Sequence, residues 1–506
     1  MASYAAFEID KLLAFSVNKG LIESEDVAYA RNRLFEIMQI DAPDAEGPFV
    51  FDFLPETLTP MAEALSDIAV QNGLIRDTFE SRDLFLAKLA GAITPSPYEV
   101  RARFQALYEQ SPEKATEWFY EMCRAVDYIK VDRINKNARF FEGGLEITIN
   151  LSKPEKDPRD IANALKVKSA GYPKCMLCIE NPGYAGRLGF PARQNHRMIP
   201  MQLNGENWHL QYSPYLYYNE HCIVLSDEHR PMKITEEAFR RLFGFVSLYP
   251  HYFLGSNADL PIVGGSILTH DHFQGGNYEF PMDKAPDEIS LACDTDGISA
   301  SIVDWPMSCL RLKSESSEAL IQKAVQVLDA WRAYSDEENG VYAFTDQPHN
   351  TITPIVRKLG GVWKMDLVLR NNRTSAEHPL GIFHPHTDLH HIKKENIGLI
   401  EVMGLMILPG RLLSELDDVA KYLMGAKPLP EKMAADEKGA CHIDWAKQLV
   451  QTYGTDNSAQ AADEIVKKGV ADKCRRVLAD AGVFKQTEKG RNGFVRFLNT
   501  VGFQKA

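Results

Sequence analysis

The two ends of the chain carry the periodicity of helices. Between residues 9 and 38, apolar side chains including Leu13, Val17 and Leu21 recur with the spacing of one helical face. Asn18-Lys19-Gly20 interrupts this pattern. After residue 410 the pattern is helical again, with an amphipathic stretch at 464–479. We therefore expect helical segments at both termini.

The central part of the chain changes to a strand pattern. Apolar and polar residues alternate over 145–150, which predicts a strand with one buried face. A second strand is expected at 222–225, followed by a helix. The segments 351–359 and 362–370 flank Gly360-Gly361, a pair that can adopt the positive φ angles of a tight hairpin. The pattern predicts an α+β fold with antiparallel sheet.

Composition narrows the classes of partner. The 506 residues include 56 Lys and Arg against 69 Asp and Glu, a net charge of -13, so the surface repels phosphate backbones and nucleic acid is not an expected partner. The N-terminus has no basic flank ahead of an apolar stretch, and no apolar run reaches the ~20 residues of a spanning helix. We expect a cytoplasmic protein with no membrane role.

The candidate chemistry is concentrated in the middle of the chain. All but one of the 14 histidines lie between residues 196 and 391. Among them is the motif His270-Asp-His272-Phe-Gln274. If residues 267–274 form an extended strand, its period of two places His270, His272 and Gln274 on one face.

Small residues surround this motif. Gly264 and Gly265 allow a ligand to approach the backbone closely, and Ser266 adds a hydroxyl group suited to phosphate oxygens. A glycine-rich turn ahead of a strand with surface histidines is the alternative interpretation. This alternative does not explain the second glycine pair, Gly275-Gly276.

Only two of the eight cysteines are close in sequence, which argues against a disulfide framework. Cys175-x-x-Cys178 has the spacing of a zinc knuckle. A redox pair would require a thioredoxin-like setting, which the neighbouring Tyr-Pro-Lys and Glu-Asn-Pro-Gly sequences do not provide.

These motifs resemble those of the class II galactose-1-phosphate uridylyltransferases, relatives of the histidine-triad superfamily. Residues 260–276 match the signature of that family except at Thr269, where a smaller residue is expected. The resemblance extends to Tyr172-Pro-Lys-Cys-Met-Leu-Cys178, Tyr218-Asn-Glu-His-Cys-Ile-Val-Leu-Ser226, Leu369-Arg-Asn-Asn-Arg-Thr-Ser375, His384-Pro-His386 and His390-His-Ile-Lys-Lys-Glu-Asn-Ile-Gly398.

The resemblance implies a ping-pong exchange. UDP-glucose gives its uridylyl group to His272, glucose 1-phosphate leaves, and galactose 1-phosphate accepts the group to form UDP-galactose. A neutral imidazole, with an ordinary pKa near ~6.5, has a lone pair for attack on phosphorus. The Gln274 amide can donate a hydrogen bond to a phosphate oxygen but cannot supply a proton, and a sugar phosphate leaving group needs none. A backbone carbonyl is expected to fix the tautomer of the nucleophile.

The resemblance also implies a structural zinc site. In the related class I enzymes, a Cys-x-x-Cys pair is completed by a histidine that follows a short strand and by the first histidine of H-x-H. Cys175, Cys178, His229 and His270 match these positions. The alternative is that the cysteines are reduced and bind no metal, while His270 forms only hydrogen bonds.

A second H-x-H, His384-Pro-His386, indicates two histidine-triad-like halves, which the resemblance places in a homodimer. The expected segments are 1–127 (helical), 128–300 (first half, with nucleophile and zinc), 301–410 (second half) and 411–506 (helical). The second copy lacks the x-Gln and is not expected to be nucleophilic. In class I relatives this pair helps to bind a second metal, but structural histidines are an equal alternative here.

Substrate contacts follow from residue type and resemblance. Asn257, Gly265 and Ser266 match positions that hold uridine and phosphates, while Lys153 and Lys156 can neutralise a diphosphate, as can Arg370 and Arg373. Each basic residue can equally be an ordinary loop or turn residue. Near Gly404, where polar contacts to the sugar are expected, the chain has Leu405 and Met406.

Two other functions use the same residues. A dinucleoside polyphosphate phosphorylase would use the H-x-H-x-Q face with phosphate as the acceptor. A non-catalytic, zinc-stabilised binding protein would use it only to hold a ligand or metal. The acceptor, phosphate or sugar phosphate, separates the two enzymes. Imidazole rescue of a His272 variant separates either enzyme from the binding protein, because only a nucleophile can be replaced in this way.

Overall fold

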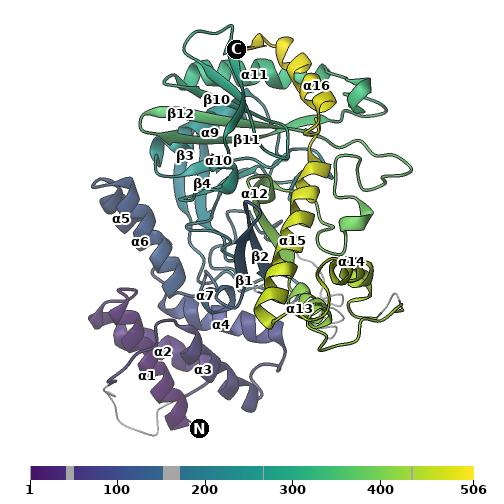
Figure 1. Cartoon of the computed structure of the whole chain (residues 1–506). Coiled ribbons are helices and arrows are strands. Elements are labelled where there is room, and N and C mark those ends of the chain that lie inside the picture. Colours follow the sequence, from purple (N-terminus) through teal and green to yellow (C-terminus); the bar gives the residue numbers. More distant parts are fainter. Residues whose placement is uncertain (1, 42–50, 152–170, 266, 435–436) are drawn as a thin grey trace. The chain divides into compact units, whose positions relative to one another are not determined.

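The computed structural model describes residues 2–41, 51–151, 171–265, 267–434 and 437–506 (Figure 1). Contacts within the chain define two compact units. The first unit contains residues 1–136, 152–230 and 270–272, and the second contains 137–151, 231–269 and 273–506.

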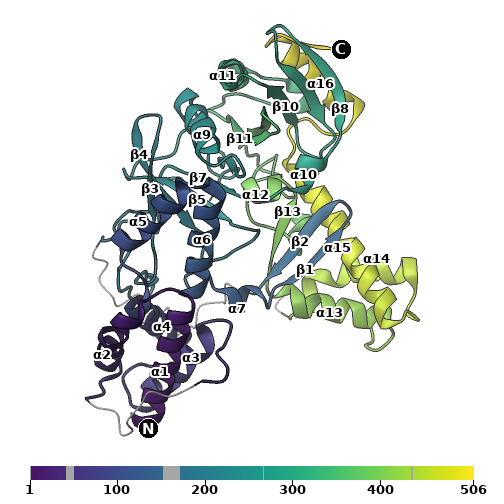
Figure 2. The same ribbon diagram turned by 90° about the vertical axis from the view of Figure 1, so that its left-hand side faces the viewer.

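The first unit begins with a group of helices (Figure 2). A break at Gly20, which has φ of 64°, separates the first two helices, as the sequence predicts. Ser96 caps its helix through a reciprocal pair of hydrogen bonds with Glu99. The helices are α1 (Ala2–Asn18), η1 (Ser24–Asp26), α2 (Val27–Met38), α3 (Thr59–Gln71), α4 (Phe79–Ile93), α5 (Pro97–Tyr108), α6 (Pro112–Ala125) and α7 (Val131–Ile134).

Three antiparallel strands follow in the first unit: β3 (Ile199–Leu203), β4 (Glu206–Tyr212) and β5 (Cys222–Ser226). The buried side chains of β4 include Trp208 and Tyr212, and Tyr212 packs against Phe119 of α6 with ring centroids 5.2 Å apart. These contacts anchor the sheet to the helices. Strand β5 of this sheet leads toward His229. It confirms the strand predicted at 222–225.

The larger sheet of the second unit is antiparallel and has the strand order β14-β8-β9-β10-β12-β11-β6-β7. Its longest hairpin turns at Gly360 and Gly361, whose φ angles are 54° and 92°, which confirms the prediction from sequence. The strands are β6 (Phe253–Gly255), β7 (His272–Gly276), β8 (Asp287–Cys293), β9 (Ser299–Val303), β10 (Cys309–Ser314), β11 (Asn350–Leu359), β12 (Val362–Asn371) and β14 (Phe503–Lys505).

Helices α9 (Glu236–Leu248) and α11 (Ser317–Ala333) contact each other and β11 of this sheet (Figure 1). The apolar face of α9 is buried, with Phe239 and Leu242 fully enclosed. Shorter helical elements connect the strands: α10 (Pro281–Lys284), η2 (Glu337–Asn339), η3 (Thr387–Leu389) and α12 (Leu399–Val402).

A three-stranded sheet forms a second layer, with β1 (Ala138–Glu142), β2 (Leu145–Asn150) and β13 (Leu405–Pro409) side by side (Figure 2). Leu145, Ile147 and Ile149 of β2 are buried, as the alternation predicts. Helix α15 contacts this sheet and α13. The C-terminal helices are α13 (Leu412–Leu423), η4 (Ala440–His442), α14 (Ile443–Tyr453), α15 (Ala459–Ala481) and α16 (Glu488–Asn499), which confirms the helical pattern after residue 410.

The expected extended strand over 267–274 is wrong in its first half. Residues 268 and 269 form a turn, His270 lies in a bend, and the strand β7 begins only at His272. The backbone there is held by other partners, because the amide of Met232 donates to the carbonyl of Leu268 at 3.0 Å. The α+β fold class is confirmed. Among the described residues, no helix has the length and apolar character to span a membrane.

Candidate active site and metal centre

Two cysteines and two histidines of the first unit meet at one point. The Sγ atoms of Cys175 and Cys178 lie 3.6 Å apart, Nδ1 of His270 is 3.3 Å from Cys175 Sγ, and Nδ1 of His229 is 3.2 Å from Cys178 Sγ. One ligand atom from each residue lies within 4.8 Å of the others. Ligands bound to one tetrahedral ion at ~2.0–2.3 Å have this spacing. The structure therefore brings together the four predicted ligands in a cluster that can hold a metal ion.

Hydrogen bonds to sulfur and to carbonyl oxygens shape the Cys-x-x-Cys loop. The amide of Leu177 donates to Cys175 Sγ, and the amide of Cys175 donates to Cys178 Sγ, both at 3.4 Å. The fully buried Asn181 carboxamide donates to the carbonyl oxygens of Cys175 and Cys178, at 2.9 and 2.7 Å. Sequence reasoning missed Asn181. Its position three residues after the second cysteine was the available signal.

Histidine 270 is oriented by a backbone carbonyl. Its Nε2 donates to the carbonyl oxygen of Ser226 at 2.9 Å, and this leaves the lone pair on Nδ1, the nitrogen that faces the cysteines. Burial raises the pKa of the Cys175 thiol to about 11, so this thiol stays protonated at neutral pH unless a cation lies beside it. The donor set and its geometry fit a metal ion.

Histidine 272 is held by the same stretch of backbone. Its Nδ1 lies 2.7 Å from the carbonyl oxygen of His270 and donates to it, so the proton is on Nδ1 and Nε2 carries the lone pair. Among the described residues, Nε2 has no hydrogen-bond partner. Burial lowers the pKa of His272 to about 4, so the ring is neutral at pH 7. The carbonyl that the sequence could not name is therefore that of His270.

Glutamine 274 and the glycine loop lie in the second unit. Gln274 is half-buried on β7 and pairs with Gly255 of β6. The Asn257 carboxamide is buried, and its Oδ1 accepts from the amide of Leu399 at 2.8 Å. A Cβ atom at Gly265 would lie 2.6 Å from Nδ2 of Asn257, so only glycine fits beside this side chain. Asn257 and Gly265 are thus neighbours.

The remaining predicted substrate residues have different surroundings. Arg370 is 1% exposed, and its guanidinium donates to the carbonyl of Ile397 at 2.9 Å. Burial lowers the pKa of Arg370 to about 10. Arg373 donates to the carbonyl of Gly340 at 2.6 Å. Three further predicted residues lie outside the described part of the chain: Lys153, Lys156 and Ser266.

The second H-x-H has different surroundings in the second unit. The two nitrogens of His384 face Pro385 O at 3.2 Å and Asn396 Oδ1 at 3.3 Å. His386 stacks on His378 with ring centroids 4.2 Å apart, and its Nε2 faces the carbonyl of Ile382 at 3.1 Å. Both rings of this pair are thus engaged by neighbouring groups.

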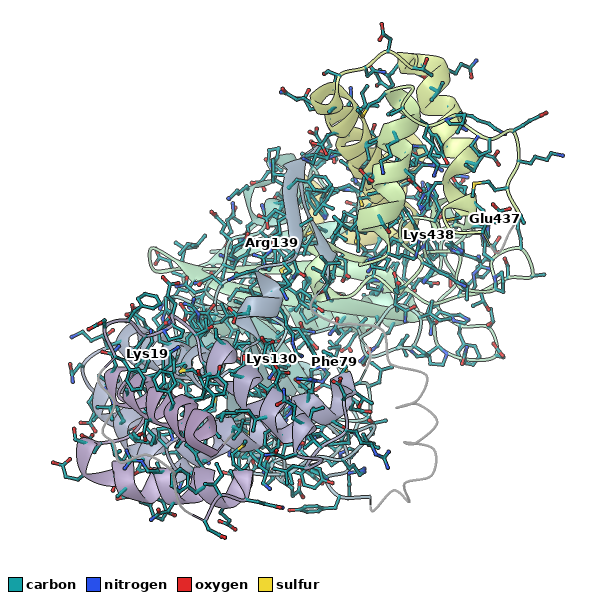
Figure 3. The ribbon with its side chains drawn as sticks, turned by 90° about the horizontal axis from the view of Figure 1, so that it is seen from below. Lys19, Phe79, Lys130, Arg139, Glu437 and Lys438 are labelled. Carbon is teal, nitrogen blue, oxygen red and sulfur yellow. The ribbon has the colours of Figure 1, made fainter. Side chains whose placement is uncertain are left out.

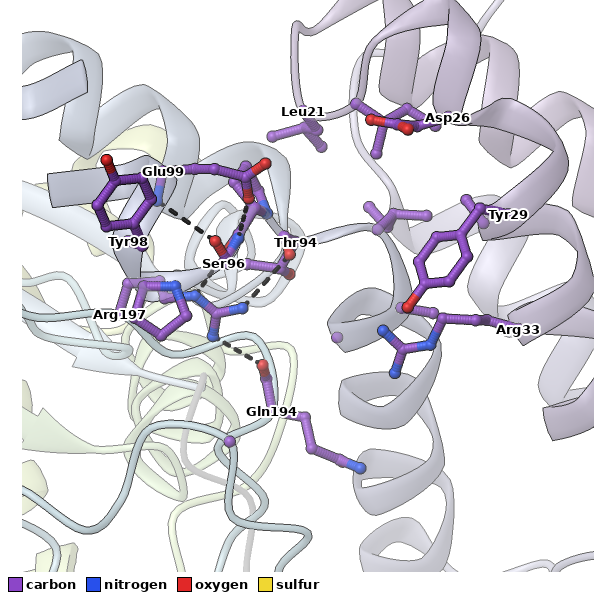
Figure 4. A pocket seen from close by; sticks show the side chains of 18 of the residues that line it. Leu21, Asp26, Tyr29, Arg33, Thr94, Ser96, Tyr98, Glu99, Gln194 and Arg197 are labelled. Atoms are coloured by element: carbon purple, nitrogen blue, oxygen red, sulfur yellow. Dashed lines mark hydrogen bonds between the residues drawn. The ribbon is translucent and has the colours of Figure 1, made fainter. Parts of the chain in front are cut away.

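A cleft of about 950 Å³ lies elsewhere in the first unit. Figure 4 shows Tyr29 and Arg33 on one side of it, with Ser96, Glu99 and Arg197 on the other. The buried Arg197 guanidinium donates to backbone carbonyls there, including Thr94 O and Gln194 O. The lining contains no cysteine or histidine, so this cleft is separate from the Cys/His cluster.

A buried imidazole that is neutral at pH 7 and starts an antiparallel strand, two residues after a histidine of a possible metal cluster, is typical of histidine-dependent group-transfer proteins. Comparison of the sequence with protein families gives the particular family. Two family models match: galactose-1-phosphate uridyl transferase, N-terminal domain, over residues 20–231, and its C-terminal domain over residues 245–441. The chain belongs to the galactose-1-phosphate uridyl transferase family.

Individual relatives match this chain over nearly its whole length. A galactose-1-phosphate uridylyltransferase of Caldanaerobacter subterraneus subsp. tengcongensis is 49% identical, with 99% of each chain covered. The protein of that name from Bacillus subtilis is 46% identical over 98% of this chain and 97% of its own length. A crystal structure of yeast Ap4A phosphorylase Apa2 aligns at 14% identity and a TM-score of 0.28, covering 58% of this chain and 88% of that one.

Proposed function

We propose that this protein transfers the uridylyl group between UDP-glucose and galactose 1-phosphate by a ping-pong mechanism, through a covalent uridylyl-His272 intermediate. The hydrogen bond from His272 Nδ1 to the carbonyl of His270, at 2.7 Å, carries the proposal. It places a bare nitrogen on a buried neutral ring, as a nucleophile requires. The choice of substrates rests on the family and on the relatives that match nearly the whole chain.

In the first half-reaction, the lone pair of His272 Nε2 attacks the α-phosphorus of UDP-glucose. A P–N bond forms, the P–O bond to the leaving group breaks, and glucose 1-phosphate departs with the electron pair as an anion that needs no proton. The ring keeps its Nδ1 proton, and the carbonyl of His270 shares the positive charge that the ring gains. Galactose 1-phosphate then attacks phosphorus in the reverse sense and releases UDP-galactose.

Gln274 donates a hydrogen bond to a non-bridging oxygen of the transferring phosphoryl group in this proposal. An amide is suited to this role because it stabilises negative charge without protonating the leaving group. Asn257, Gly265 and Ser266 hold the uridine and phosphates. Binding of the diphosphate by Lys153 and Lys156, and of phosphate by Arg370 and Arg373, stays a prediction.

Cys175, Cys178, His229 and His270 hold a structural zinc ion in this account. Four protein ligands close the tetrahedral site, so the ion supplies rigidity rather than an open coordination position. His270 links the two parts of the site, because its ring belongs to the metal cluster and its carbonyl orients His272. A second metal at His384 and His386, assembly as a homodimer, the division into two histidine-triad-like halves and a cytoplasmic location also stay predictions.

Isotope exchange tests the proposed mechanism. With UDP-glucose, labelled glucose 1-phosphate and no galactose 1-phosphate, the label should enter UDP-glucose, because the covalent intermediate forms without the second substrate. The His272→Gly variant should lose this exchange and regain part of it when free imidazole is added. Failure of exchange, together with nucleotide release from a dinucleoside polyphosphate and phosphate, would favour the phosphorylase. No turnover with either donor would favour a binding protein.

A further inference from the structure

A second group of metal-ligating side chains lies in the C-terminal helical part of the second unit. Glu415 is on α13, and Cys441 and His442 are in the short 3₁₀-helix η4. One potential ligand atom from each of the three residues lies within 4.8 Å of the other two. The ligand atoms of the Cys/His cluster in the first unit lie within the same distance of one another. Atoms that bind one ion at ~2.0–2.3 Å are this close together.

The fold places these groups at the border between core and solvent. Helices α13 and α14 pack on each other, and η4 leads directly into α14. Glu415 and His442 are 7% and 1% exposed, whereas Cys441 is exposed. The loop just before it is also exposed at Glu437 and Lys438, which are labelled in Figure 3. An ion from solvent can therefore reach the cluster on the side of Cys441.

The ring of His442 has a polar partner at each nitrogen. Its Nδ1 is 2.7 Å from Nδ1 of the buried His391, and its Nε2 is 2.9 Å from Oε2 of Glu415. If His442 Nδ1 donates to His391, then Nε2 carries a lone pair that faces a carboxylate oxygen. A cation between Nε2 and Glu415 makes that arrangement favourable. His391 then acts as the outer partner that orients a metal-binding histidine.

We propose that Glu415, Cys441 and His442 bind a divalent transition-metal ion of the zinc type, separately from the Cys/His cluster of the first unit. One nitrogen, one sulfur and one oxygen donor suit zinc, and three protein ligands leave a fourth position for water. The carboxylate and the thiolate bring negative charge to the ion. Arg411, which pairs with the carboxylate of Glu415, keeps that side chain in place.

Alkylation of the zinc-loaded and zinc-free full-length protein tests this site, with Zn²⁺ itself as the probe. Iodoacetamide followed by peptide mass spectrometry should label Cys441 at least tenfold more slowly when Zn²⁺ is present. Cys293 is the matched control within the chain, because it is partly exposed and belongs to neither cluster, and its labelling should not change. Equal labelling of Cys441 with and without Zn²⁺ would overturn the proposal and leave a hydrogen-bonded His391-His442-Glu415 network.

The zinc content of the purified protein is a second, independent test of the site at Cys441. The wild-type protein should retain about one more zinc ion per chain than Cys441→Ser and His442→Gln variants, with uridylyltransferase activity unchanged in both. Replacing the exposed Cys441 preserves the core, and circular dichroism checks the fold. Equal zinc content in wild type and both variants would contradict the second site, whatever the outcome for the transferase activity.

Discussion

The two H-x-H pairs of this chain share a spacing and differ in the groups that surround their rings. At 270–272 the first ring belongs to a Cys/His cluster, and the second ring uses one nitrogen for a carbonyl while its other nitrogen has no partner among the described residues. At 384–386 the first ring has a neighbour at each nitrogen, and the second is stacked on another histidine. The spacing alone therefore does not make a nucleophile.

The difference lies in the groups that contact each pair. The cluster at His270 fixes one side chain, so the carbonyl of the same residue has a defined direction and orients His272. His384 and His386 instead face the carbonyls of Pro385 and Ile382 within their own turn. We infer that the Cys/His cluster, rather than the motif itself, prepares His272 for attack.

The largest expected effect separates the two pairs. His272→Ala should lower the rate of uridylyl transfer by about 10⁴-fold or more, because no other group replaces the nucleophile. His386→Ala should change it by less than about tenfold, since that ring contacts His378 and the carbonyl of Ile382 and has no part in the proposed mechanism. Steady-state kinetics with UDP-glucose and galactose 1-phosphate measures both. A comparable loss in the two variants would remove the distinction.

The second largest effect is expected at the residue two positions after each H-x-H pair. Gln274→Ala should lower kcat by about 10²–10³-fold with little change in stability, which is the usual result of removing one donor to a transition-state oxygen. The matched change is Asp388→Ala, because Asp388 is exposed and pairs with Arg476. That variant should keep nearly full activity. An inactive Asp388→Ala with an active Gln274→Ala would reverse the assignment.

Disturbing the Cys/His cluster should have an intermediate effect. Cys178→Ser should lose bound metal, unfold at a lower temperature and be about 10–100-fold less active, as is typical when the support of a site is disturbed. Cys293→Ser is the control for loss of a cysteine outside both clusters. Metal content, thermal unfolding and initial rates decide the point. Full activity in a metal-free Cys178→Ser protein would show that the cluster does not prepare His272.

The pH dependence gives the smallest effect. Burial lowers the pKa of His272 to about 4, so the neutral nucleophile persists as the pH falls from 7 to 5.5. The first half-reaction with UDP-glucose should then change by less than about twofold, whereas a histidine of ordinary pKa near ~6.5 would lose about eightfold. Rapid-quench measurement of glucose 1-phosphate release tests this. A rate that falls with a midpoint near ~6.5 would contradict the buried neutral ring.

The sequence predicts the elements well where one local signal decides them. The helical spacing at Leu13 and Val17, the break before Leu21, the alternation over 145–150 and the Gly360-Gly361 turn all appear as predicted. The strand at 267–274 fails because distant backbone partners impose a turn at 268 and 269. Such partners leave no trace in local periodicity.

The candidate site shows the same limit. The Cys-x-x-Cys spacing indicates a metal site, and the family resemblance adds His229 and His270; the structure brings all four side chains together. The burial of Arg370 could not be foreseen, because a guanidinium in a polar turn gives no sign of its depth in the fold. The cluster of Glu415, Cys441 and His442 was also missed. Cys441 and His442 are adjacent, but Glu415 lies on a separate helix, and the three residues belong to no motif.

The most direct test of the account is to detect the covalent intermediate. The protein is incubated with UDP-glucose alone, quenched in base to preserve a histidine phosphoramidate, digested and mapped by mass spectrometry. The account predicts a uridylyl group on His272, discharged as UDP-galactose when galactose 1-phosphate is added. A uridylyl group on another residue, or its absence while UDP-glucose is bound and turned over, would contradict it.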